Sequence, residues 1–266
     1  RAKRARTAAA TEIERAFARL LHIDDVARLR GLRALVGKSS APKADADDHW
    51  QRLLYVLLGE MGPYAEMQRY WDGLWARPHL RDELRQLLAL LDDRSRLVST
   101  PLEGVTIPAL RTHATYGLLE VMSAVDERTK KGGVKKIQIG VYYVERLKTD
   151  LLFVTLEKSE KDYSPTTLYN DYPISRTRFH WESQSSCHAG TKTGRRYTQA
   201  TTGSGQHVLL FVRERKKDAR GETMPYRFLG PCTYRTHKGA RPMQIEWTLN
   251  YAMPASFYQE VKVAAG

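Results

Sequence analysis

Two patterns of hydrophobic and polar positions divide the chain near residue 100. In the first part, apolar side chains recur every three or four positions, which is the spacing of one face of a helix. Polar breaks, a glycine and a proline separate the periodic stretches. They predict helices over residues 11–36, 47–61, 64–78 and 80–93. We therefore expect a helical connector module over residues 1–100.

From about residue 101 the pattern changes. One more helix is expected near Thr115, and after residue 133 the apolar segments become short, β-branched and aromatic, with turn formers between them. These strand-like segments are 136–147, 150–158, 207–215, 225–237 and 242–249. Five or more short strands with few helices between them favour an antiparallel barrel or a strongly bent sheet. The expected fold class is α+β, with a curved, antiparallel, barrel-like β domain over residues 101–266.

The net charge of +13 indicates a partner class, because such an excess attracts polyanions, and nucleic acid is the commonest of these in a cytosol. The glycine-bearing stretches GTKTG (190–194) and TTGSG (201–205) predict hairpin turns. Arginines on such a turn could meet phosphates in pairs. The candidate phosphate-binding residues are Lys135, Lys136, Lys192, Arg195, Arg196 and Tyr197. The alternative is a set of solvated charged loops, an interpretation that suits residues 215–220 best.

Composition also bounds the class of protein. With only Cys187 and Cys232, a disulfide framework is not expected, and a reducing, cytoplasmic compartment fits. The longest apolar runs are too short to cross a membrane. We find no phosphate-binding loop of an ATPase and no paired metal-ligand spacing, so no cofactor or metal is expected. A nuclease triad drawn from Asp150, Glu157 and Lys158 places the lysine one residue too close to the second acid.

Ordered motifs along the second part carry a family resemblance. They run from LRTHATYGLLEVM (110–122) through GVYYVERLKTDLLFVTLEK (140–158), FHWESQS (179–185) and TGRRY (193–197) to RPMQIEWTL (241–249). Together they resemble a bacterial C-terminal domain, long of unknown function, that ends many fusions of superfamily 2 helicases with phospholipase D-like nucleases. Such fusions resemble ATP-dependent type IV restriction enzymes, which cut DNA carrying modified cytosine.

The resemblance implies that target recognition is the task of this region, while ATP hydrolysis and DNA cleavage belong to the helicase and nuclease domains of a parent chain. Readers of modified cytosine often have a curved barrel of the SRA or PUA-like type, so that architecture is expected by analogy of role. The region itself would be no enzyme. Its partner would be double-stranded DNA with modified bases, and no membrane would be involved.

The polar, aromatic stretch 163–185 supplies the residue types of a base pocket. A reader of a base in duplex DNA has to flip the nucleotide out, stack its ring on aromatic faces and accept a hydrogen bond from the cytosine amine. The base-binding candidates are Tyr163, Tyr169, Asp171, Trp181 and Gln184.

Two alternatives stay open at the level of sequence. Trp181 alternates with its neighbours as in a strand, so its ring could belong to the core, and Asp171 could cap a turn. For the whole region, the alternative function is an interaction module that docks on the helicase core and couples ATP hydrolysis to non-specific DNA binding.

Overall fold

The computed structural model describes residues 16–95, 100–102, 104–138, 140–157 and 170–264. The chain forms two compact units. The first unit comprises residues 1–99 and 107–136, and the second comprises residues 100–106 and 137–266. The division expected at residue 100 therefore differs from the structure by the segment 107–136, which folds with the helices.

The first unit is mainly helical. Its elements are α2 (Val26–Val36), α3 (His49–Leu57), η1 (Tyr64–Glu66), α4 (Met67–Trp75), α5 (Pro78–Arg94), β1 (Thr115–Tyr116) and α6 (Leu118–Ala124). The single helix expected over 11–36 is interrupted by turns at residues 19–22, and α2 starts afresh because the Asp25 side chain accepts from the backbone amide of Arg28. None of the helices described in either unit is long and apolar enough to cross a membrane.

A buried arginine explains why residues 107–136 belong to the first unit. The Arg28 guanidinium is fully buried and donates to Glu120 Oε1 at 2.9 Å and to the carbonyl oxygen of Thr115 at 2.8 Å. It also lies 4.2 Å from the centroid of the Tyr116 ring. Burial alone would raise the pKa of Glu120, but His22 and Arg28 together hold it below its ordinary value. A buried charge requires such partners, so α2 and α6 must fold together.

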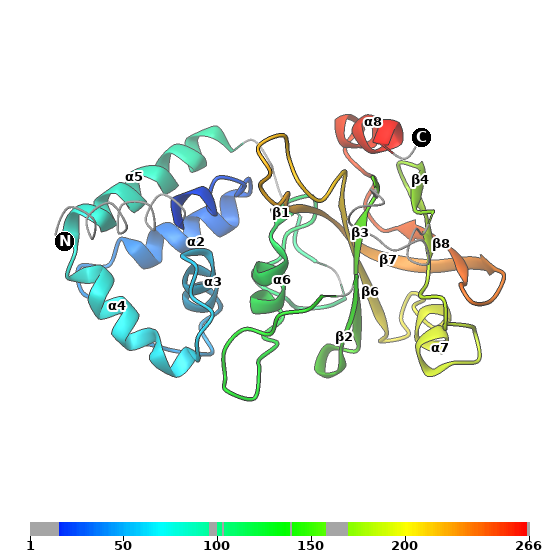
Figure 1. The fold of residues 1–266 in the computed structure, drawn as a ribbon, viewed down its shortest axis with the longest axis horizontal. Coiled ribbons are helices and arrows are strands. Elements are labelled where there is room, and N and C mark those ends of the chain that lie inside the picture. Colours follow the sequence, from blue (N-terminus) through cyan, green and yellow to red (C-terminus); the bar gives the residue numbers. More distant parts are fainter. Residues whose placement is uncertain (1–15, 96–99, 103, 139, 158–169, 265–266) are drawn as a thin grey trace. The chain divides into compact units, whose positions relative to one another are not determined.

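The second unit is a curved sheet (Figure 1). Its elements are β2 (Val141–Val144), η2 (Glu145–Leu147), β3 (Thr149–Thr155), β4 (Tyr172–Ser175), β5 (Arg178–Glu182), α7 (Lys192–Thr198), β6 (His207–Arg213), β7 (Tyr226–Lys238), β8 (Gln244–Leu249) and α8 (Ala255–Ala264). The strand order is β2-β3-β6-β7-β8-β5-β4. Neighbouring strands are antiparallel except for the parallel pair β3–β6. The expected fold class, α+β with a curved and mainly antiparallel sheet, is confirmed.

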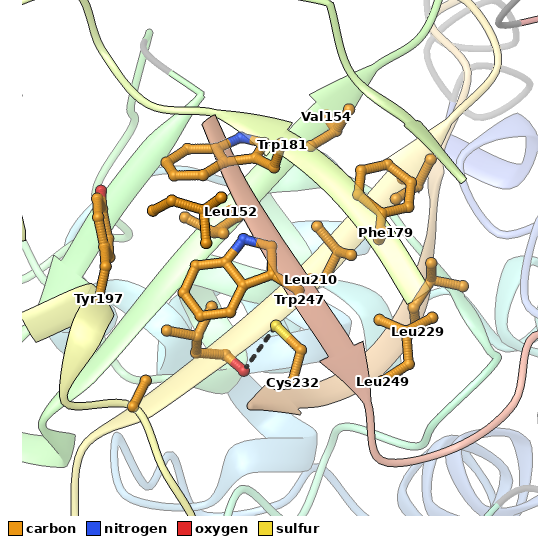
Figure 2. Close-up of a cluster of buried hydrophobic side chains, with 14 of the residues drawn as sticks. Leu152, Val154, Phe179, Trp181, Tyr197, Leu210, Leu229, Cys232, Trp247 and Leu249 are labelled. Carbon is orange, nitrogen blue, oxygen red and sulfur yellow. Dashed lines mark hydrogen bonds between the residues drawn. The ribbon is translucent and has the colours of Figure 1, made fainter. Parts of the chain in front are cut away.

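The core of the second unit lies against one face of this sheet. Alternate residues of the strands point into it, as the period of two along a strand requires. Figure 2 shows Trp181 and Trp247 beside Leu152 and Leu210, with Tyr197 at the edge of the cluster. The interior strands β3 and β6 are also buried on their other face, where the rings of Phe153 and Phe211 stack with centroids 4.9 Å apart. Burial on both faces explains why these two segments are the most continuously apolar of the chain.

The turn expected at GTKTG is wrong, because these residues start the helix α7. The Thr191 hydroxyl oxygen accepts from the backbone amide of Gly194 at 3.0 Å and so caps the helix. Gly194 is needed for close packing, since a Cβ atom there would lie 2.0 Å from the carbonyl oxygen of His188. The stretch TTGSG also closes no hairpin: it lies in the loop 199–206, which joins α7 to β6.

Two helical glycines should therefore respond to alanine with opposite signs. We expect Gly194→Ala to destabilise the protein by about 1–3 kcal/mol, because the backbone near His188 has to move. Gly73 lies in α4 with no atom near its missing Cβ, so Gly73→Ala should stabilise by about 0.5–1 kcal/mol. Thermal unfolding of both variants beside the wild type measures the two shifts. A rise in Tm for Gly194→Ala would contradict the packing argument.

Candidate nucleic-acid interface

Several segments of the second unit meet at one end of the sheet, which we call the α7 end: Lys148, α7, the loop 199–206 and the β7–β8 hairpin (residues 239–243). The parallel strands β3 and β6 both begin here, and the amide of His207 donates to the carbonyl oxygen of Lys148 at 2.9 Å. The amide of Tyr234 in β7 donates to Ala200, and that of Arg241 in the hairpin donates to Cys187. Strands and loops far apart in sequence are thus joined by backbone hydrogen bonds.

The α7 end carries an excess of available positive charge. Its exposed cationic residues include Lys148, Lys192, Arg195, Lys238 and Arg241. In the part of the chain that the structure describes, none of the five forms an ion pair. The nearby carboxylate of Glu246 is already paired with Arg178 at 3.1 Å and with Arg235 at 3.0 Å. Glu145 on η2 is an exposed acid at this end. The balance at this end is therefore positive.

A hollow of about 560 Å³ opens at the α7 end. The residues that line it are Lys148, Thr198, Gln199, Thr201, Ser204, Gly205 and Gln206. The set contains one cation, three hydroxyls and two carboxamides, and none of the seven is an acid. The loop can follow this path because Gly203 and Gly205 take φ values of +79° and +72°, which favour glycine. Hydroxyl, amide and ammonium donors around a hollow are suited to an anion.

Beneath the hollow lies a buried ion pair. Arg196 Nε donates to Asp150 Oδ2 and Arg196 Nη2 to Asp150 Oδ1, both at 2.9 Å, so the pair is bidentate. Asp150 has no exposed surface, and Gln206 Nε2 also donates to it at 3.3 Å. The other side of the guanidinium is covered by the Tyr143 ring, whose centroid is 3.9 Å away. The sequence predicted Arg196 as a phosphate ligand, but here its Nε and Nη2 donate to Asp150 and one face of its guanidinium lies against Tyr143.

The pKa values agree with this arrangement. The hydrogen bonds to Asp150 raise the pKa of the Arg196 guanidinium above its ordinary value. Burial raises the pKa of the Asp150 carboxyl, and the bonds from Arg196 oppose that rise. The nuclease alternative at Asp150 thus finds its carboxylate already bound to an arginine and a carboxamide. Among the described residues, no three His, Cys, Asp or Glu side chains come together as metal ligands.

Two of the predicted ligand-binding aromatic residues lie in the core. Trp181 is 4% exposed and Tyr197 is 0% exposed, and their ring centroids lie 5.3 Å apart at 87° (Figure 2). Burial raises the pKa of Tyr197 well above its ordinary value, and no described residue offers its hydroxyl a hydrogen bond. Neither ring has an open face for a base or a phosphate in this conformation. The alternative of a core tryptophan, which alternation along the strand had left open, agrees with the observed burial.

The remaining base-binding candidates are placed unevenly. Tyr163 and Tyr169 lie outside the described residues. Gln184 is half-buried just beyond β5. Asp171 is buried, and its Oδ1 accepts from the backbone amide of Glu182 at 3.0 Å. Asp171 therefore lies beside the last residue of β5, at the α7 end.

The phosphate-binding candidates also lie in different parts of the structure. Lys192 and Arg195 are exposed on α7, where Arg195 Nη1 donates to the carbonyl oxygen of Gly190 at 2.8 Å. Lys135 and Lys136 belong to the first unit. Sequence reasoning did not single out Lys238 or Arg241, although the basic turn KGAR (238–241) was a usable signal.

Two aromatic residues of neighbouring strands stack on each other outside the core. Tyr172 of β4 and His180 of β5 stack with ring centroids 4.6 Å apart and an interplanar angle of 18°. Both are half-buried on the face opposite Phe179 and Trp181, and burial lowers the pKa of His180 below its ordinary value. Alternation of residues 178–182 was the signal that could have placed this pair.

A comparison with known protein families gives one match of more than half of the chain. The family model described as a domain of unknown function (DUF3427) matches residues 110–261, which include β2 to β8 and α7. No curated protein matches the chain.

The role of Arg196 as a buried partner can be tested by removal. We expect Arg196→Ala to lower the free energy of unfolding by about 3–5 kcal/mol at pH 7.5, since Asp150 is left buried and unpaired. Without the arginine, burial raises the pKa of Asp150 further. Its protonated form is then favoured in the folded state, so the difference in free energy of unfolding between the wild type and the variant should shrink as the pH falls towards 4.5. Urea unfolding of the variant and the wild type at both pH values measures this. An equal deficit at both pH values would contradict it.

Proposed function

The chain belongs to the family described as a domain of unknown function (DUF3427), and we propose that it binds double-stranded DNA through the α7 end. One observation carries the proposal: the α7 end bears five exposed cationic residues that form no ion pair among the described residues, and one of them, Lys148, lines a hollow whose described lining contains no acid. Such a surface is complementary to the DNA backbone, because lysine and arginine contacts to phosphates supply most of the non-specific affinity.

We further propose that this region recognises a modified cytosine, 5-methyl or 5-hydroxymethyl, for a restriction or defence helicase–nuclease in the cytoplasm. The support is the family resemblance of the motifs and the location of Asp171, which lies beside β5 at the same end as the cations. In this proposal, the region itself catalyses no reaction, and helicase and nuclease domains of a parent chain hydrolyse ATP and cleave the DNA. No cofactor or metal takes part.

Salt dependence tests the backbone contacts. The variant Lys192→Gln/Arg195→Gln/Arg241→Gln removes three cationic groups from the α7 end. The slope of log K against log salt concentration is negative, and we expect its magnitude to decrease by about 2–3 units, since each lost phosphate contact removes about 0.9. Fluorescence-anisotropy titrations of a duplex at several salt concentrations measure the slope.

A charge-matched control is available at the opposite end of the sheet. The loop after β6 carries Arg215, Lys217 and Arg220, all exposed. Substituting these three by glutamine makes the same charge change, and we expect the slope to stay within about one unit of the wild type. If the loop variant lost the salt dependence and the α7 variant kept it, the interface would be misplaced.

Base recognition is tested separately with matched duplexes that carry cytosine, 5-methylcytosine or 5-hydroxymethylcytosine. We expect tighter binding to one modified duplex and loss of that preference in Asp171→Asn. Asparagine keeps an oxygen that can accept from the Glu182 amide, but it carries no negative charge and one of its two side-chain polar atoms is a donor, so it is a poorer acceptor for the cytosine amine. Equal affinity of the wild type for all three duplexes would contradict recognition of these bases and leave the alternative of a docking module with non-specific DNA binding.

A further inference from the structure

We infer that the hollow at the α7 end is a dedicated site for one sugar–phosphate unit, in which the Lys148 ammonium, the backbone amide of Gly205 and the hydroxyls of Thr201 and Ser204 hold the phosphate. This inference deepens the proposed function and rests on it for one point only, the source of the phosphate. In the proposed function that source is the backbone of DNA.

The charge around the hollow favours a bound anion. Lys148 is its one charged lining residue and has no ion-pair partner among the described residues. The acid closest in sequence, Asp150, is fully buried and is neutralised by the two hydrogen bonds from Arg196. Gln206 donates to the same carboxylate and so stands between it and the hollow. The positive charge of Lys148 is therefore left available to a ligand.

The backbone holds Lys148 in position. Its φ value of 47° is in the left-handed region, which lysine adopts only when its surroundings require it. Two backbone hydrogen bonds fix this conformation. The Lys148 amide donates to the carbonyl oxygen of Glu145 at 3.1 Å, and the Lys148 carbonyl oxygen accepts from the backbone amide of His207 at 2.9 Å. The side chain is exposed at the junction of η2 and β3. A fixed backbone here lowers the entropy cost of binding.

The neutral donors are also available. The backbone amide of Gly205 has no acceptor among the described residues. The Ser204 hydroxyl donates to the carbonyl oxygen of Gln206 at 3.3 Å, and the Thr201 hydroxyl to that of Gln199 at 3.5 Å. Hydroxyl bonds are usually shorter by about 0.5 Å, so both bonds are weak and a phosphate oxygen can replace them. Charged acceptors form the stronger bonds.

The size of the hollow points to more than a bare phosphate. The hollow is open to solvent and, at about 560 Å³, leaves room for a sugar beside the phosphate. The carboxamide of Gln199 supplies both a donor and an acceptor for sugar hydroxyl or ring oxygens. The ligand class is thus a sugar phosphate, either one unit of a DNA strand or a free nucleotide.

The direct test is an NMR titration of the full chain labelled with ¹⁵N, using deoxythymidine monophosphate, with thymidine and inorganic phosphate as comparisons. We expect the Gly205 amide signal to shift with the nucleotide, less with inorganic phosphate and not with thymidine. The shift should be lost in Lys148→Gln and reduced in Thr201→Val/Ser204→Ala. Lys262→Gln, an equal charge change at an exposed position of α8, should keep it.

A DNA titration separates the two proposals. We expect Lys148→Gln to reduce the magnitude of the slope of log K against log salt concentration by about 0.9, as loss of one phosphate contact requires. Lys262→Gln should leave this slope unchanged. If Lys148→Gln matched Lys262→Gln and no Gly205 shift occurred, the hollow site would be overturned while the proposed function stood. If the nucleotide bound but no duplex did, the proposed function would fail and the site would serve a free nucleotide. A thymidine shift as large as that of the nucleotide would also overturn the phosphate assignment.

Discussion

The α7 end depends on one buried ion pair. Asp150 is the second residue of β3 and has no access to solvent, and a carboxylate in that position needs a partner that brings both charge and hydrogen bonds. Arg196 meets this need in bidentate geometry, and Tyr143 covers its flat face. The pair joins β2, β3 and α7. It therefore fixes the helix against the start of the parallel strands and, with it, the loop that forms the hollow.

This constraint divides two adjacent arginines between different tasks. Successive residues of a helix point about 100° apart, so when Arg196 turns inwards to Asp150, Arg195 is directed elsewhere. Arg195 is exposed, and among the described residues its side chain bonds a carbonyl oxygen of its own loop. The charge of one arginine stabilises the fold and that of the other stays available to a ligand. The first unit uses a second arginine in the same way, since Arg28 lies fully buried between carboxylates and the Tyr116 ring. The net charge of +13 thus counts both structural and available cations, and only the local geometry separates them.

The strands could be predicted from sequence where their pattern was strong. The segments that became β3 and β6 are apolar on both faces, and β8 alternates, so the local pattern of residues was sufficient to predict these strands. The role of Arg196 could not be predicted, because it depends on the phase of a helix that was not expected and on a partner 46 residues away. The helix itself was missed because glycine in GTKTG is usually a turn signal, whereas here Thr191 caps the helix and Gly194 permits close packing. Trp181 was predicted to bind a ligand because the residues around it are polar. Its alternation with His180 and Glu182 along the strand was the more reliable guide to its place in the core.

The burial of Trp181 and Tyr197 changes the energetics of base recognition. Flipping a nucleotide costs a few kcal/mol, and each aromatic ring that stacks on it returns about 1–3 kcal/mol. With these two rings committed to the core, stacking on a flipped base would depend on other aromatic residues, of which the described part of this region offers the half-buried Tyr172. That contribution can offset flipping but leaves little for affinity, so the net binding energy has to come from phosphate contacts. A reader built in this way would keep its affinity at the α7 end and its selectivity beside Asp171, and salt would weaken binding without changing which base is preferred.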